Sequence, residues 1–582
     1  MPALVLIILL PLAVSLLLFF IPQHKVKLKG RLTLAVSLAL MLGSIRVFFD
    51  APISVQVIFP SNYPQLLHAA GAFLVFNTVG VSSIMVLILG IMLPLLAIGA
   101  FANHSRSSSQ NHFYTWFLVS AGLCFSIITA GHLYMLIFLW GLSGIPLYLL
   151  ASGFDDSRAS MGKKTLVLFG AAHGLMTIGA VMLVALSGTA YLGEIELSTI
   201  NAPNTIAFLT LLSGGLMATG IFPFHSWVIA FGEFAPGRTS ALLPVIIQRF
   251  AGIYLLIRLI SDLFILSESM RIGLFSLASI TVVLATIMSL IEHHAGKRLA
   301  FIQVVVGGLA LMAISTGTPA GLKASIIYAL AAGAAITAMF LIFERNLLHD
   351  NSLSKKLPAL VNTAGKNILS SQGFLLMSLG GLPPFGIFAA HILLFKGLWE
   401  FFDGVSSVKY LSLLWVLVAV GAAGGLLATA LLIKAGQQAA EPETKIEKPL
   451  RSLLFEMSIL SFTLVAVSAA FLLFLTPFER IAQIFYAESQ WAWGSRHLLL
   501  VAGCILLSMV AGIWAFRSLL GKSGGLLRVP KWIEASNHAD IYYVVSRLVF
   551  SIHRPLSRMH DGVLQTYLLW VVALLVILFF LI

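Results

Sequence analysis

Long apolar stretches recur along the chain and are separated by short polar segments. A stretch of roughly 20 apolar residues is long enough to cross a bilayer as an α-helix. The pattern predicts about sixteen such spans, at 3–21, 31–49, 77–101, 113–131, 133–152, 164–188, 205–230, 240–261, 271–291, 299–316, 323–343, 367–399, 408–434, 452–476, 497–517 and 563–582. We therefore predict an all-α polytopic membrane protein.

Proline lies in several of these spans, and two of the spans are predicted to be interrupted: 205–230 at Pro223, and 367–399 at the Gly/Pro-rich run that contains Pro383 and Pro384. Proline removes a backbone hydrogen bond and crowds the preceding helical turn, so each span is predicted to be a broken helix. Non-helical backbone at membrane depth is tolerated only beside protein or water. Interrupted helices in corresponding positions of two halves are typical of inverted-repeat transporters. The sequence thus predicts two inverted five-helix repeats.

The repeats suggest a division of the chain into five parts. These are N-terminal transmembrane helices (1–110), a first repeat (111–265), a second repeat (266–434), a polar cytoplasmic linker (435–451) and C-terminal helices (452–582). Within the last part, 521–562 is amphipathic and is predicted to lie at the membrane interface.

Composition and charge agree with a membrane protein. Hydrophobic residues make up 59% of the chain, charged residues only 10%, and the mean hydropathy is +1.00. The net charge of +13 is explained by basic cytoplasmic loops and anionic lipid, and we expect no nucleic-acid partner. Alternate loops carry the Lys and Arg residues, whereas 50–76 and 189–204 carry none. The positive-inside rule then predicts a multi-pass protein of the cell inner (cytoplasmic) membrane with both termini on the outer side.

Metal and cofactor chemistry is not expected in this chain. Its two cysteines, Cys124 and Cys504, each lie in an apolar run, without a C-x-x-C motif or a His/Cys cluster. Metal and iron–sulfur sites need such clusters, and free cysteines of this kind are usually small packing residues. We therefore expect no metal, no cofactor and no catalytic site.

The stretch 211–258 carries an ordered set of motifs. They are P-x-H-x-W, then A-P-x-x-x-S-A-L, then G-x-Y-x-x-x-R, carried here by Pro223, His225, Trp227, Ala235, Pro236, Ser240, Ala241, Leu242, Gly252, Tyr254 and Arg258. In this the chain resembles the antiporter-like membrane subunits of respiratory complex I, Mrp antiporters and membrane-bound hydrogenases. Its extra C-terminal spans are similar to the larger, distal type of subunit.

The resemblance implies a proton path of buried charges, but most of those charges are replaced here. The family's half-channels use a Glu–Lys pair, a central Lys with neighbouring His, and an exit Lys or Glu. The corresponding positions of this chain carry Gly141, Ala218, Pro244, Ala329, Gly333, Thr337 and His391. A path lined by methyl groups is drier than one lined by charges.

Seven residues remain as proton path candidates: His225, His391, Arg249, His173, Gln303, Thr337 and Tyr328. His225 and His391 lie at or near the two breaks, and imidazole titrates near neutral pH. Arg249 would act as a fixed charge because a guanidinium does not release its proton in proteins. The other reading of each histidine is a hydrogen-bonded packing residue.

The resemblance implies a subunit of a complex I-like or hydrogenase-like assembly, contributing to proton (or sodium) translocation coupled to redox chemistry in other subunits. Its partners would be membrane and peripheral subunits and the lipid bilayer, and the assembly would be a quinone-linked oxidoreductase. Two hypotheses remain beside this one. The lost charges favour a non-conducting membrane scaffold, and related subunits also occur as energy-coupling partners of a peripheral protein in inorganic-carbon uptake.

Overall fold

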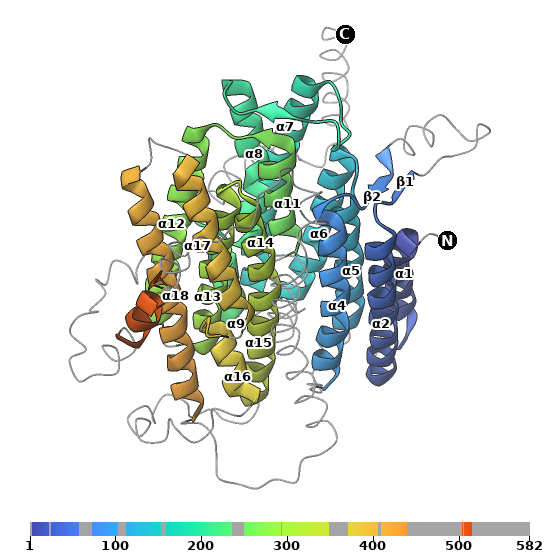
Figure 1. Cartoon of the computed structure of the whole chain (residues 1–582). Coiled ribbons are helices and arrows are strands. Elements are labelled where there is room, and N and C mark those ends of the chain that lie inside the picture. The colour runs from blue at the N-terminus through green and yellow to red at the C-terminus, as the bar shows by residue number, and fades with distance from the viewer. Residues whose placement is uncertain are drawn as a thin grey trace, which may run out of the picture. The chain divides into compact units, whose positions relative to one another are not determined.

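The computed structural model describes residues 3–22, 25–56, 73–102, 112–152, 159–234, 250–292, 294–347, 371–383, 385–404, 409–438, 503–504 and 506–514. The chain divides into two compact units, Met1–Arg528 and Val529–Ile582, and every described residue lies in the first. Within that unit, long helices run alongside one another (Figure 1).

The helices follow the apolar stretches of the sequence. The first six are α1 (Ala3–Phe20), α2 (Val26–Asp50), α4 (Val81–Ala102), α5 (Phe113–Thr129), α6 (Leu133–Ser152) and α7 (Ala159–Ser187). They are followed by α8 (Ala202–Thr219), α9 (Ser226–Phe234), α11 (Ile253–Ile257), the π-helix η4 (Arg258–Leu263), α12 (Glu268–Ile291), α13 (Ala295–Ser315), α14 (Pro319–Ile327), the π-helix η5 (Tyr328–Ala332), α15 (Gly333–Leu347), α16 (Ser371–Leu379), α17 (Gly386–Gly404) and α18 (Lys409–Gln438). Every span predicted between residues 3 and 434 overlaps one of these helices or a consecutive set.

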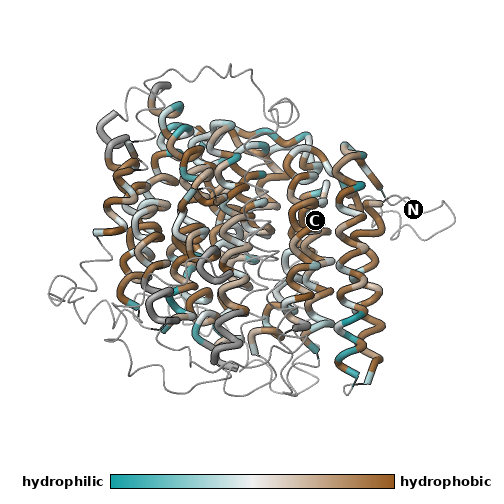
Figure 2. The backbone as a smooth tube through the Cα atoms, turned by 60° about the horizontal axis from the view of Figure 1, so that its bottom comes forward, coloured by the Kyte–Doolittle hydropathy of each residue, from teal (hydrophilic) through white to brown (hydrophobic). Residues whose placement is uncertain are grey.

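The predicted all-α polytopic fold is confirmed. Among the described residues, nine helices are long and apolar enough to cross a membrane, and hydrophobic residues occupy most of their length (Figure 2). Large apolar side chains such as Leu16 and Phe20 are exposed on the outer helices, as expected for a surface covered by lipid. The spans predicted at 452–476 and 563–582, and the interfacial segment 521–562, lie outside the described residues.

Neighbouring helices in the chain pack against one another, and some contacts join distant segments. α1 contacts α2 and α5, α6 contacts α7, α7 contacts α8, and α12 contacts both α13 and α18. Glycine allows close approaches of this kind: a β-carbon added at Gly214 would collide with the Sδ of Met176. Ser289 and Thr429 also share a buried hydrogen bond of 3.1 Å between α12 and α18.

Short backbone pairs join the loops at one end of the helices. β1 (Ser54–Gln56) pairs with β2 (Val75–Asn77) in antiparallel fashion, and β3 (Leu197–Ser198) pairs with β4 (Phe264–Ile265) in parallel fashion. A further bridge links His132 to Tyr191. The loops that lack Lys and Arg therefore gather at this end of the described unit.

Ion pairing joins two loops at the opposite end. The Nζ of Lys297, at the start of α13, lies 2.8 Å from the Glu233 carboxylate at the end of α9. His294 caps α13 by accepting a hydrogen bond from the Lys297 backbone N–H. Burial lowers the pKa of His294, and Glu233 opposes that shift. Lys297 thus lies at the end of the described unit opposite to the described parts of the loops that lack Lys and Arg.

Candidate functional site

The first helix break lies between α8 and α9. α8 ends at Thr219, and Gly220 adopts the left-handed conformation with φ of 70°. The Ile221 N–H then donates to the Leu216 carbonyl at 3.0 Å, the bond that closes a glycine C-cap. Pro223 follows this cap, so the helix ends before the proline rather than at it.

Two aromatic contacts hold the backbone at this break. The indole N–H of Trp227 donates to the Met217 carbonyl at 2.9 Å, and Trp227 is fully buried. The Met217 carbonyl also accepts the Gly220 N–H of the glycine cap at 3.1 Å, so the indole ties α9 to the capped end of α8. The His225 ring stacks on Phe222 with ring centroids 5.5 Å apart. The two ends of the break are therefore held at fixed positions within the protein.

The second break repeats the hydrogen-bond pattern of the first. α16 ends at Leu379, Gly381 has φ of 66°, and the Leu382 N–H donates to the Met377 carbonyl at 3.1 Å. A turn follows each cap, from Phe224 to Ile221 in the first break and from Phe385 to Leu382 in the second. Pro383 lies in the second turn, and Pro384 lies outside the described residues.

The structure brings two of the predicted candidates together beside the second break. The Tyr328 hydroxyl and the His391 Nδ1 are 2.9 Å apart, and the two residues are 0% and 5% exposed. Tyr328 begins η5, and π-helical turns inside helices frequently occur at functional sites. The His391 Nε2 is buried without a hydrogen-bond partner among the described residues. This nitrogen can exchange a proton with a bound water.

The remaining candidates are placed on separate elements. His173 lies on α7, Gln303 on α13 and Thr337 on α15, and the last two are buried. The Gln303 Nε2 has no hydrogen-bond partner in the part of the chain that the structure describes. His225 lies at the first break, just before α9, whereas Tyr328 and His391 lie on η5 and α17. Arg249 lies outside the described residues.

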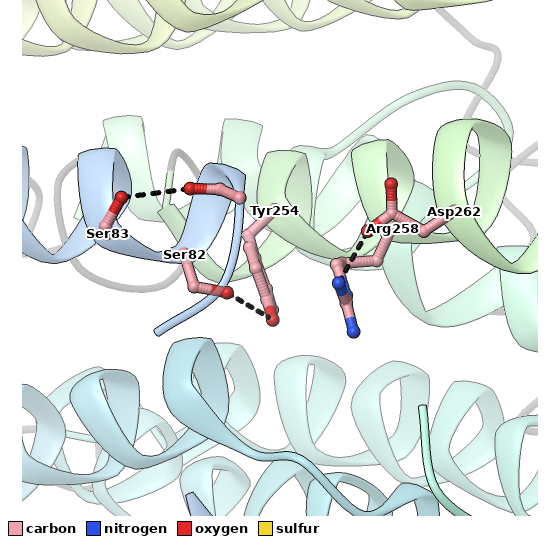
Figure 3. A network of polar contacts seen from close by, with 6 residues as sticks. Ser82, Ser83, Tyr254, Arg258 and Asp262 are labelled. Atoms are coloured by element: carbon pink, nitrogen blue, oxygen red, sulfur yellow. Dashed lines mark hydrogen bonds and ion pairs between the residues drawn. The ribbon is translucent and has the colours of Figure 1, made fainter. Parts of the chain in front are cut away.

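A polar network at the end of α11 was not predicted. The Arg258 guanidinium and the Asp262 carboxylate are 2.5 Å apart, with side chains 9% and 28% exposed. The buried Tyr254 hydroxyl lies 3.2 Å from the Ser82 hydroxyl of α4 (Figure 3). The i, i+4 spacing of Arg258 and Asp262 is a signal that could have revealed this pair.

Three charged residues on α14 and α17 were also missed. Lys323 is 2% exposed within α14, and Lys396 forms an ion pair with Glu400 on α17 at 3.5 Å. An ionisable residue inside an otherwise apolar span indicates function by default. That signal was present in the sequence for Lys323, within a stretch predicted as a span.

The comparisons with known proteins agree with this architecture. Residues 130–417 match the family model described as NADH:quinone oxidoreductase/Mrp antiporter, TM. An NAD(P)H-quinone oxidoreductase chain 4-3 of Nostoc is 26% identical over 437 residues, covering 72% of this chain and 75% of the relative. An NADH-quinone oxidoreductase subunit N of Phocaeicola vulgatus is 23% identical over 317 residues, covering 53% of this chain and 66% of the relative.

Solved structures share the fold. A chain of the Mrp complex from Dietzia matches 99% of this chain and 62% of its own length, with a TM-score of 0.73 and 17% identity. A chain of the membrane-bound sulfane sulfur reductase matches 84% of this chain and all of its own length, with a TM-score of 0.62 and 17% identity. This chain spans 66% and 61% of the first two curated relatives that it matches. The match over residues 130–417 and the shared fold make this integral, multi-pass membrane protein similar to the antiporter-like membrane subunits of the NADH:quinone oxidoreductase/Mrp type.

Proposed function

We propose that this chain is a membrane subunit of a complex I-like or hydrogenase-like assembly and contributes to proton (or sodium) translocation. Redox chemistry in the other subunits drives the transport. The proposal is supported by relatives named as quinone oxidoreductase subunits and by neighbours solved within Mrp and respiratory complexes. The chain lies in the cytoplasmic membrane with both termini outside, as its basic loops favour.

The observation that carries the proposal is the buried Tyr328–His391 pair beside a broken helix. A buried histidine can move a proton when its hydrogen-bond partners fix the orientation of the ring. Tyr328 fixes Nδ1, and Nε2 is left to exchange protons. The shared cap geometry at Ile221 and Leu382 supports the division into two repeats, 111–265 and 266–434, with one ion path in each.

Purification of the chain with its natural partners tests this function. Mass spectrometry should find quinone- or hydrogenase-type subunits, and the reconstituted complex should move protons when its electron donor is oxidised. The variant His391→Ala should lower the redox-driven proton flux by about 10²-fold, the scale on which one acid–base group acts. Ser276→Ala is the control, because its exposed hydroxyl donates to the Ile272 carbonyl of its own helix and to no other residue that the structure describes. Unchanged flux in His391→Ala would remove His391 from the path.

A specific contact favours a second function, that of a non-conducting scaffold. A β-carbon added at Gly252 would lie 2.9 Å from the Ala218 β-carbon, and Ala218 is fully buried. The first break is therefore packed tightly against α11 by apolar groups at this point. The scaffold function replaces the transport function if the complex assembles fully and moves the same number of protons per electron whether it contains the wild-type chain or the His391→Ala variant. Recovery of one peripheral protein without redox subunits would instead favour inorganic-carbon uptake.

A further inference from the structure

We propose that the chain binds phosphatidylethanolamine, with the lipid headgroup held where α6 begins and one acyl chain lying along the exposed face of α6. The headgroup site consists of four aromatic rings, those of Phe73, His132, Tyr134 and Tyr191, and the carboxylate of Glu194. It lies at the end of the described unit where the loops without Lys and Arg gather. The proposal does not depend on ion transport.

Three loops bring the rings of the headgroup site together. Phe73 comes just before β2, His132 and Tyr134 lie where α5 is followed by α6, and Tyr191 lies between α7 and α8. The His132 ring is central, with its centroid 4.9 Å from that of Phe73 and 5.4 Å from that of Tyr191. Tyr134 adds a third neighbouring ring at 5.7 Å. The backbone bridge between His132 and Tyr191 holds two of the loops in this arrangement.

The outer rings of the headgroup site are accessible, whereas the central ring is buried. Phe73, Tyr134 and Tyr191 are 42%, 37% and 39% exposed, and His132 is 5% exposed. Phe73 and Tyr191 meet the His132 ring at 84° and 85°, and an edge-to-face contact of this kind covers the face of only one of the two rings. The face of an aromatic ring attracts cations. The cluster therefore suits an ammonium group.

The turn that carries Tyr191 also carries an exposed carboxylate, that of Glu194. The Glu194 N–H donates to the Tyr191 carbonyl at 3.0 Å. The Thr189 hydroxyl donates to the Glu194 Oε2 at 2.8 Å and accepts the Tyr191 N–H at 3.2 Å. These bonds fix the carboxylate relative to the Tyr191 backbone. A carboxylate accepts several hydrogen bonds at once, so Glu194 can also accept one from the N–H of an ammonium group.

The charges around the headgroup site favour a cationic group over an anionic one. The loops 50–76, 130–134 and 189–204 contain no Lys or Arg, and the last of them contains Glu194 and Glu196. Burial lowers the pKa of His132 below its ordinary value, so its ring is neutral near neutral pH and does not repel a cation. A lipid whose headgroup carries only negative charge would find no cationic partner in these three loops.

The exposed face of α6 indicates that the ammonium group belongs to a lipid. Phe138 and Ile145 are exposed, and they follow Tyr134 by four and eleven residues, so the three side chains share one face of the helix. At the α-helical rise this apolar stripe is about 16 Å long, close to the depth of one leaflet of a hydrocarbon core about 30 Å thick. One acyl chain can lie along this stripe while its headgroup contacts Tyr134.

Lipid binding to the full chain, purified in a mild detergent, tests the proposal. Native mass spectrometry measures the affinity for dioleoyl lipids that differ only in their headgroups. Phosphatidylethanolamine should bind about 10-fold more tightly than phosphatidylcholine, because the methyl groups of choline keep the positive charge but remove the N–H groups that bind Glu194. Phosphatidylglycerol, which has no ammonium group, should bind more weakly than both.

Variants of the headgroup site separate the carboxylate from the rings. Glu194→Gln keeps an oxygen that can accept from Thr189, and should weaken the binding of phosphatidylethanolamine about 10-fold. The matched control is Glu196→Gln, which removes the same charge from the same loop outside the turn of Thr189–Glu194, and which should bind like the wild type. Tyr191→Leu should weaken the binding about 3-fold, whereas Tyr191→Phe keeps the ring and should bind like the wild type.

Several outcomes would overturn the proposal. Equal affinity for the three lipids would exclude recognition of the headgroup, and equal effects of Glu194→Gln and Glu196→Gln would show only a general attraction to an acidic loop. If free ethanolamine displaces the lipid as readily as phosphatidylethanolamine does, the site binds a small amine instead. If the complex purified through this chain retains no phosphatidylethanolamine, a partner subunit covers the site. Should a variant fail to fold, the preference of the wild-type chain for phosphatidylethanolamine over phosphatidylcholine decides the question.

Discussion

The imidazole of His173 lies against Gly141, so that a β-carbon added at Gly141 would be 2.7 Å from the Nε2 atom. The contact joins α6 to α7, where Trp140 also stacks on Phe169 with ring centroids 6.2 Å apart. Gly141 is the position at which the family resemblance leads one to expect a carboxylate. In this chain the space beside it is occupied by an imidazole from the next helix.

Gly141→Ala should lower the stability of the chain by at most about 1 kcal/mol, because the cost of displacing the half-buried His173 ring is partly offset by the preference for Ala over Gly in a helix. The ring of His173 must move to admit the methyl group. In the double variant with His173→Ala the penalty should shrink, with a coupling energy of about 0.5–3 kcal/mol. Thermal unfolding of the four proteins in detergent measures this coupling. Strictly additive effects would show that the two side chains do not compete for space.

The Arg258–Asp262 pair should contribute more to the free energy of unfolding than an exposed ion pair of the same spacing. Arg258→Met leaves a partly buried carboxylate without its partner and should cost about 2–3 kcal/mol, less than the 3–5 kcal/mol found for fully buried pairs. The matched control is Arg46→Met, because the Arg46–Asp50 side chains are 73% and 46% exposed. That variant should cost less than about 1 kcal/mol. Equal shifts in thermal midpoint for the two variants would contradict the prediction.

His132 should make the stability depend on pH. It is 5% exposed and packs against Phe73 and Tyr191, with ring centroids 4.9 and 5.4 Å away. Burial lowers the pKa of His132 below the ordinary 6.5, so the unfolded chain binds more protons in mildly acid solution. The contribution of His132 to stability is full above about pH 6.5 and is lost as the pH falls. Thermal midpoints between about pH 5 and 7.5 should decline less steeply in His132→Phe.

Labelling with a membrane-impermeant thiol reagent tests the orientation. Cysteine introduced at Glu194 should react from outside the cell, and cysteine introduced at Lys297 should react only after the membrane is opened. The native Cys124 is buried and should stay silent. A cysteine at residue 25 should be labelled like the one introduced at Lys297, and a cysteine at residue 60 should be labelled like the one introduced at Glu194. The reverse pattern would invert the topology.

The local pattern of apolar residues predicted most of the fold, because each membrane helix satisfies the hydrogen bonds of its backbone within its own segment. The pairing of Leu197 with Phe264 was not predictable, since strands of two residues carry no periodic signal and join distant loops. Helix breaks were predicted from Pro223 and Pro383, although glycine caps end both helices first. The His391–Tyr328 contact needed the register of two helices, which hydropathy does not contain. Lys323 was overlooked because one charge barely changes the mean of an apolar window.

The backbone pair between Leu197 and Phe264 also requires that the chain between them crosses the membrane an even number of times. Two strands that share hydrogen bonds must lie on one side of the membrane, so the chain between them crosses an even number of times. α8 leaves that side, and α11 with η4 returns to it. Glu233 therefore belongs to the opposite side, as its ion pair with Lys297 independently requires. Insertion of a single extra crossing in this stretch would be incompatible with both contacts at once.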